Sequence, residues 1–188
     1  MTRPKKADRR VERTRLALLN AFRDLILSGG YDRMKIGDII AAADVGRSTF
    51  YEHFGSKDDI LRQSLTAPFG ILADTVDASY LQAHLEMIVA HFWENRRLAR
   101  VIFSGSSRRI VARRLAELIE ERLTAQSRSG ERDVIPVRLI AAHLAEAQLG
   151  LVEAWVTGKT ACSAEMLARA IALSTRASLA ALRGGSPA

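Results

Sequence analysis

The chain has 188 residues, of which 48% are hydrophobic, and a formal net charge of +7. This length suits one compact unit or a small domain fused to a larger one, and the excess of basic residues suits an anionic partner, nucleic acid before membrane. Cys162 is the only cysteine. It excludes an intramolecular disulfide and a cysteine-rich metal site, and it fits a reducing cytosol.

The sequence pattern carries no signal for secretion or membrane insertion. Residues 1–15 are basic, and no apolar segment of the signal-peptide kind follows them. The most apolar late stretch, residues 139–156, is interrupted by His143, Glu146, Gln148 and Glu153, so we do not expect it to span a bilayer. We therefore expect a cytoplasmic protein with no membrane partner.

A basic arm opens the chain, and its cationic residues are Arg3, Lys5, Lys6, Arg9 and Arg10. The arm either follows a nucleic-acid backbone or only aids solubility. Behind it we predict a helix over about residues 8–27, because Val11, Leu18, Phe22 and Leu25 recur at helical spacing. Gly29 and Gly30 end this helix, since glycine readily takes the left-handed conformation found at helix C-termini.

Two short periodic segments follow, residues 36–43 and 47–53, separated by three residues. Two short helices joined by a tight turn are the sequence form of a helix-turn-helix. Its predicted core consists of Ile36, Ile39, Ile40, Val45, Phe50 and Phe54. Its second helix would expose Arg47, Ser48, Thr49, Tyr51, Glu52 and His53.

This exposed set has the chemistry of a DNA-reading surface. Arg47 can offer two donors to a guanine edge. The remaining donors suit phosphate oxygens: Ser48, Thr49, Tyr51 and His53. Lys57 adds charge at the start of the next helix, which we expect to begin at Ser56. Each residue also has a plain alternative, because Arg47 can be a solvated surface charge and Tyr51 and His53 can simply cover the first helix.

The sequence pattern after about residue 67 predicts helices and no strands. We predict helices at 67–77, 79–93, 96–103, 107–126, 136–157 and 163–183, with a polar loop over 127–133. No strand-like alternation persists in the sequence, so the predicted fold class is all-α. The expected domains are a helix-turn-helix domain over residues 1–62 and a larger helical domain over residues 63–188.

A longer constellation surrounds the two short helices. It consists of Gly30-Tyr31, Ile36, Asp38-Ile39, Ala43, Val45, Thr49, Tyr51, His53-Phe54 and Ser56-Lys57. Both the residues and their intervals resemble the DNA-binding domain of the TetR family of transcriptional regulators. The resemblance implies a homodimer that reads a palindromic double-stranded operator, with a variable second domain for dimerisation and, usually, for binding a small-molecule effector.

Three positions depart from the family's usual residues. Lys35 stands where a threonine commonly caps a helix, and its side chain can meet a phosphate instead. Asp44 stands where the turn usually has glycine, but aspartate is among the side chains that tolerate left-handed geometry. Gly46 replaces a capping serine, at a cost of about a few tenths of a kcal/mol.

Within the second domain, the predicted 79–93 helix carries two stripes. Leu81, Leu85, Ile88 and Phe92 form an apolar stripe, which we expect in the core. Tyr80, His84, Met87 and His91 form a mixed stripe that can line an effector cavity, with Phe103 and Trp155 as further wall candidates. Alternatively the mixed stripe faces solvent or a domain contact, and both Phe103 and Trp155 belong to the core. His84 and His91 lie about 10 Å apart along a helix, too far to share a metal ion by themselves.

The last two predicted helices look like a dimer surface. Apolar residues repeat along the first of them at Ile140, Leu144, Leu151 and Trp155. Along the second they repeat at Met166, Leu167, Ala170, Ile171 and Ala177. Their periodicity alone fits packing within one subunit equally well.

The leading functional hypothesis is therefore a dimeric repressor released from its operator by a small-molecule effector. The alternative is a DNA-binding regulator controlled by a protein partner, or a nucleoid-associated protein, without a small-molecule ligand. We predict neither an enzyme nor a cofactor, because the sequence has no nucleophile elbow, no phosphate-binding glycine loop and no metal-spaced ligand set.

Overall fold

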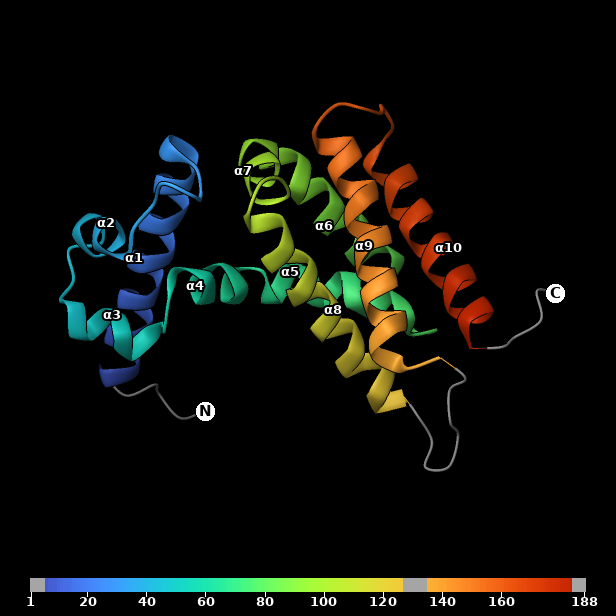
Figure 1. The fold of residues 1–188 in the computed structure, drawn as a ribbon, viewed down its shortest axis with the longest axis horizontal. Helices are drawn as coiled ribbons and strands as arrows, with labels where there is room; N and C mark the ends of the chain where they lie inside the picture. The colour runs from blue at the N-terminus through green and yellow to red at the C-terminus, as the bar shows by residue number, and fades with distance from the viewer. Residues whose placement is uncertain (1–5, 127–134, 184–188) are drawn as a thin grey trace. The chain divides into compact units, whose positions relative to one another are not determined.

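The protein is described by a computed structural model that covers residues 6–126 and 135–183. Over these residues every regular element is helical, as the sequence predicted (Figure 1). The chain divides into two compact units, Met1–Ser64 and Leu65–Ala188. The dividing point lies close to the expected domain boundary at residue 62.

The first unit contains α1 (Lys6–Gly29), α2 (Ile36–Ala42), α3 (Arg47–His53) and α4 (Lys57–Ser64). The predicted end of α1 is confirmed, because Gly30 has φ +77° and its N–H donates to the Ile26 carbonyl at 2.9 Å. The bounds of α2 and α3 are also those predicted, to within one residue. The core is aromatic and aliphatic: Leu18, Phe22, Ile26, Ile39, Phe50, Phe54, Ile60 and Leu61. Val11, at the start of α1, is exposed instead.

The second unit begins with α5 (Thr66–Ala73), the 3₁₀ turn η1 (Asp74–Val76) and α6 (Gln82–Glu94). The predicted 67–77 helix thus tightens into a 3₁₀ turn at its end. α6 also begins later than the predicted residue 79, because the Asp77 carboxylate accepts hydrogen bonds from the Ser79 N–H and hydroxyl, each at 2.8 Å. That local turn competes with the helix. The sequence predicted Leu81 in the core. In the structure Leu81 lies just before α6 and is 59% exposed, so that prediction is wrong.

The remaining helices are α7 (Arg96–Ile102), α8 (Ser107–Gln126), α9 (Val137–Val156) and α10 (Ala164–Leu182). Helix α9 packs against both α8 and α10 (Figure 1). Its residues Ile140, Leu144, Leu149 and Val152 are fully buried. By length and composition α9 would pass as a membrane span, but half of that stretch is buried inside the unit, as in the core helix of a globular domain.

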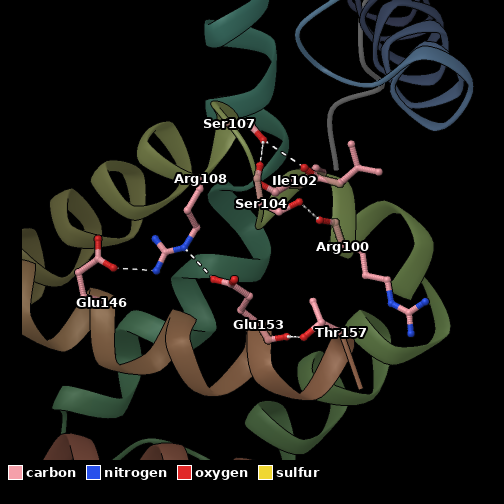
Figure 2. Close-up of polar contacts among 9 residues, drawn as sticks. Arg100, Ile102, Ser104, Ser107, Arg108, Glu146, Glu153 and Thr157 are labelled. Atoms are coloured by element: carbon pink, nitrogen blue, oxygen red, sulfur yellow. Dashed lines mark hydrogen bonds and ion pairs between the residues drawn. The ribbon is translucent and has the colours of Figure 1, made fainter. Parts of the chain in front are cut away.

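A polar cluster fixes the turn between α7 and α8 onto α9 (Figure 2). The buried Ser107 hydroxyl lies 2.9 Å from the Ile102 carbonyl oxygen, and Arg108 forms ion pairs with Glu146 at 2.7 Å and Glu153 at 3.3 Å. Both carboxylates come from α9. The arginine therefore joins the first turn of α8 to two carboxylates that lie about two turns apart on α9.

Candidate nucleic-acid interface

The turn between α2 and α3 has the tight geometry that a helix-turn-helix requires. Asp44 has φ +52°, so it occupies the left-handed conformation expected for this position. The Val45 N–H then donates to the Ile40 carbonyl at 3.3 Å, which closes the end of α2. Asp44 therefore adopts the left-handed conformation for which glycine is the usual residue.

The starts of α2, α3 and α4 are capped differently. Asp38 accepts a hydrogen bond from the Lys35 N–H at 2.8 Å, so the first turn of α2 caps itself from within. Gly46 precedes α3 and offers no side-chain cap. Ser56 caps the start of α4 by accepting from the Asp59 N–H at 3.1 Å, and the Asp59 carboxylate accepts from the Gly55 N–H at 3.0 Å, one residue before the cap.

Helix α3 has one buried face. Phe50 is fully buried, and the adjoining Phe54 is buried beside it, with 6.3 Å between the two ring centres. Ile39 of α2 is also fully buried. These three residues confirm the inner part of the predicted core, whereas Ile36, Ile40 and Val45 are only half-buried. The anchoring of α3 through one face leaves its opposite face outward.

The outward face carries the residues that the sequence singled out. Arg47, Ser48, Glu52 and Tyr51 are exposed, the tyrosine to 48%. The Arg47 guanidinium lies 5.9 Å from the centre of the Tyr51 ring. Thr49 and His53 are half-buried at the edge of this face. The structure therefore brings five predicted contact residues onto one short helix, within reach of a single groove.

Lys35 and Lys57, predicted to meet phosphates, differ in their surroundings. Lys35 is exposed at the start of α2. The Lys57 ammonium is half-buried and donates to the carbonyls of Tyr31 and Met34 at 3.0 and 3.1 Å, while lying 4.5 Å from the centre of the Tyr31 ring. Lys57 thus ties α4 to the segment after α1.

Tyr31 adds a second connection between α4 and the segment after α1, and the sequence pattern did not predict this connection. Its ring is buried, and its hydroxyl donates to the Asp58 carboxylate. Burial, and then the Asp58 carboxylate, raise the pKa of the Tyr31 phenol above its ordinary value. The only sequence signal was the Gly30-Tyr31 pair within the longer constellation.

The basic arm lies partly outside the described residues, which include neither Arg3 nor Lys5 and do not describe the Lys6 side chain. Arg9, Arg10 and Arg13 are exposed on the first turns of α1. A further arginine, Arg15, reaches Gln63 at 3.3 Å and lies 6.0 Å from the centre of the Phe54 ring, so it joins α1 to the end of α3 and to α4.

The six predicted effector residues lie in different surroundings. Tyr80 and His84 line one small pocket, whereas Met87 and His91 are exposed on α6. Phe103 is buried between Phe69 and Phe92. Trp155 is buried against Trp93 and donates to the Cys162 carbonyl at 2.9 Å. Phe103 and Trp155 therefore pack in the core, whereas Met87 and His91 face outward.

The exposed face of α3, its buried aromatic anchor and the left-handed turn define the class of protein as a helix-turn-helix regulator of transcription. Residues 18–63 match the family model described as bacterial regulatory proteins, tetR family. The first unit therefore carries the DNA-binding domain that this family model describes.

Two relatives match parts of the chain, with different identities and different coverage. The chain is 41% identical over 59 residues to an uncharacterized HTH-type transcriptional regulator, YxbF, from Bacillus subtilis, covering 31% of this chain and 16% of that one. It is 28% identical over 91 residues to DhaS from Lactococcus lactis, the HTH-type activator of the dhaKLM operon, covering 48% of this chain and 49% of that one. The matched stretches thus span less than half the length of either relative.

A solved structure of a TetR-family transcriptional regulator from Syntrophomonas wolfei extends the likeness to both units. It has a TM-score of 0.60 and 24% identity, and the match covers 90% of this chain and 96% of that one. At this identity the likeness shows the fold alone. The helical second unit is therefore part of the same fold.

Proposed function

We propose that the protein is a sequence-specific, DNA-binding transcriptional regulator that acts as a homodimer in the cytoplasm and not as an enzyme. The observation that carries the proposal is the orientation of α3. Phe50 and Phe54 anchor one face in the core, while Arg47 and Tyr51 stand on the opposite, exposed face. A helix held in this way can enter a major groove with its first turn leading.

The proposed contacts follow from the chemistry of that face. Arg47 would donate to the O6 and N7 atoms of a guanine, and its position near the Tyr51 ring limits the conformations it must lose on binding. Ser48, Thr49, Tyr51 and His53 would donate to phosphates or bases. Lys35 would add a phosphate contact. Lys57 would contribute through the start of α4, since its ammonium already donates within the domain.

A second copy of the chain is the proposed partner of the last two helices. Met166, Ala170, Leu173 and Ala177 recur on the exposed side of α10, and Met166 and Leu173 are 63% and 56% exposed. Leu139, 61% exposed, adds to the apolar surface on α9. Dimerisation would bury this surface and would space two reading helices for a palindromic operator.

The proposed regulation is release of a repressor from its operator by a small-molecule effector bound in the second unit. Linkage requires that the effector bind more tightly to the conformation that does not match the operator. The named activity of the relative DhaS is activation, so the direction of regulation is a separate measurement. Control by a protein partner is the second candidate, favoured by the close packing of Phe103 and Trp155 where an effector cavity was expected.

Selection of bound fragments from a random double-stranded DNA pool tests the proposal. We expect a palindrome whose half-sites lie about one or more helical turns apart. Recovery of no sequence, or of fragments without a common motif at physiological salt, would refute sequence-specific regulation. Transcription from a promoter carrying the recovered palindrome, with and without the protein, then gives the direction of regulation.

A further inference from the structure

A small pocket of about 260 Å³ lies beside η1 in the second unit. Its walls come from α5, η1, the following turn, α6 and α8, and its lining residues are Ile71, Asp74, Asp77, Ser79, Tyr80, Leu81, His84 and Arg122. The pocket therefore suits a small metabolite rather than a drug-sized ligand.

An ion pair forms part of the pocket wall. The Arg122 guanidinium donates to the Asp74 carboxylate at 2.8 Å, and the two side chains are 39% and 48% exposed. A pair this exposed contributes little to stability, because water screens it and both side chains lose conformational freedom in forming it. A ligand that brings an anion to Arg122 and a cation to Asp74 can therefore separate the pair at little cost.

A second carboxylate strengthens the cationic preference on one side of the pocket. Asp77 is held by the Ser79 N–H and hydroxyl, and these hydrogen bonds lower the pKa of its carboxyl. The negative charge of Asp77 thus has a fixed position in the pocket lining. Ile71 and Leu81 provide aliphatic walls, so the lining combines two carboxylates, one guanidinium and an apolar surface.

We propose that this pocket binds a small zwitterion with one carboxylate and one ammonium group, of the size and chemistry of a free amino acid, and that this ligand is the effector. The ligand carboxylate pairs with Arg122, and its ammonium lies between Asp74 and Asp77. A side chain of the ligand contacts Ile71 and Leu81. This assignment of an effector rests on the proposed function, whereas the binding site itself does not.

The pocket is connected to the helices of the proposed dimer surface through the residue next to Asp74. Thr75 is fully buried, donates to the Leu72 carbonyl at 2.7 Å and accepts from the Gln148 amide nitrogen at 3.0 Å. The same nitrogen donates to the Thr175 hydroxyl at 3.0 Å. A single turn of chain, η1, therefore carries both a pocket wall and a buried link to α9 and α10.

This buried link is poised to respond to a shift of η1. Among the described residues the Gln148 amide oxygen has no hydrogen-bond partner. It can therefore accept a hydrogen bond if the groups around it move. Separation of Asp74 from Arg122 by the ligand would move η1, and Thr75 would transmit that movement to Gln148 and Thr175.

A larger groove of about 800 Å³ between α8 and α9 is the competing location. Its charges are largely paired with one another, as Arg108 is with Glu146 and Arg113 with Glu117. Arg109 lines this groove from α8 and is exposed. It therefore offers a matched control for Arg122, on the same helix and with the same charge.

Isothermal calorimetry on the full chain without DNA tests the site with the standard free L-amino acids as probes. We expect at least one to bind, and its N-acetyl and carboxamide derivatives to bind about tenfold more weakly or worse, because each lacks one of the two charges. Asp74→Asn and Arg122→Gln should weaken binding to the same degree, while Arg109→Gln should bind as the unmodified protein does. Unchanged melting temperatures would show that the variants are folded.

Three outcomes would overturn the site: binding of no free amino acid, binding by Asp74→Asn or Arg122→Gln as tight as that of the unmodified protein, or loss of binding in Arg109→Gln. The effector role is measured separately on the selected palindrome. The bound amino acid should change DNA affinity in the unmodified protein but not in Gln148→Leu or Thr175→Val, although both variants should still bind it. Absence of any DNA binding would refute the proposed function and leave the calorimetric result to decide the pocket.

Discussion

The Arg47 guanidinium lies over the Tyr51 ring, 5.9 Å from its centre and one helical turn away on α3. Both side chains are exposed, so the pair is held by the helix and not by the core. A cation above an aromatic face gains about 0.5–1 kcal/mol at such a site. The pairing favours one orientation of the arginine before any nucleic acid arrives.

Replacement of Tyr51 should therefore remove more than one hydrogen bond. We expect Tyr51→Ala to abolish binding to the selected palindrome and to leave the dimer intact, because Tyr51 belongs to the first unit and the proposed dimer surface belongs to the second. Tyr51→Phe retains the ring beneath Arg47 and should keep part of the affinity. Fluorescence anisotropy of labelled palindrome gives the affinity, and sedimentation gives the oligomeric state. Unchanged affinity in Tyr51→Ala would refute the placement of α3 at the DNA.

Gly46 provides a second prediction, on stability. A Cβ atom there would lie 3.7 Å from the Thr49 hydroxyl oxygen and 3.8 Å from that of Ser48, which are ordinary contact distances. Gly46→Ser should therefore add a hydrogen bond to the uncapped start of α3 and raise the free energy of unfolding by about a few tenths of a kcal/mol. Gly46→Ala, with no oxygen, should lower it. Urea denaturation compares them, and equal stability of the two variants would contradict the capping argument.

The helix-turn-helix was predictable from sequence because its signals are local. Glycines end α1, and aromatic spacing places Phe50 and Phe54 inward. The left-handed Asp44 was foreseen from the residues that tolerate that conformation. These features depend on neighbours a few residues apart, so periodicity and turn chemistry determine them.

Features that depend on distant residues were not predictable in the same way. Lys57 was expected to face phosphate, but a flexible lysine can reach in several directions, and only the fold brings the Tyr31 and Met34 carbonyls beneath it. The pocket beside η1 likewise combines Asp74 with Arg122, which lie 48 positions apart in the chain. Helical spacing over residues 79–93 identified Tyr80 and His84, but it could not add the residues that α5 and α8 contribute to the same pocket.

The different surroundings of the two lysines lead to a third prediction. Lys57→Met leaves two half-buried carbonyls without their donor, so we expect the free energy of unfolding to fall by about 1–3 kcal/mol. Lys35→Met, at an exposed position, should change stability by about 0.5 kcal/mol or less. It should instead weaken binding to DNA and reduce the salt dependence of that binding by about one phosphate contact. Equal stability of Lys57→Met and the unmodified protein would show that the ammonium contributes nothing to the fold.

Tyr31 predicts how stability changes at alkaline pH. Burial, followed by the hydrogen bond to Asp58, raises the pKa of Tyr31 above its ordinary value of 10.0. Below pH 10 both the folded and the unfolded chain keep this proton. Above pH 10 only the folded chain keeps it, so stability should fall by up to about 1.4 kcal/mol per pH unit from this group. Tyr31→Phe should lose that part of the slope, and identical slopes in urea titrations between about pH 9 and 11 would contradict it.

Leu173 tests the proposed dimer surface. It is 56% exposed on α10, in line with Met166, Ala170 and Ala177. A carboxylate placed within an apolar interface loses its hydration without gaining a partner, so Leu173→Glu should dissociate the dimer while the subunit remains folded. Met87→Glu is the matched control, because Met87 is equally apolar and 58% exposed but lies on α6, which contributes no residue to the proposed surface. Sedimentation equilibrium should give a monomer for Leu173→Glu and a dimer for Met87→Glu. A dimer in both would move the interface to another face of the second unit.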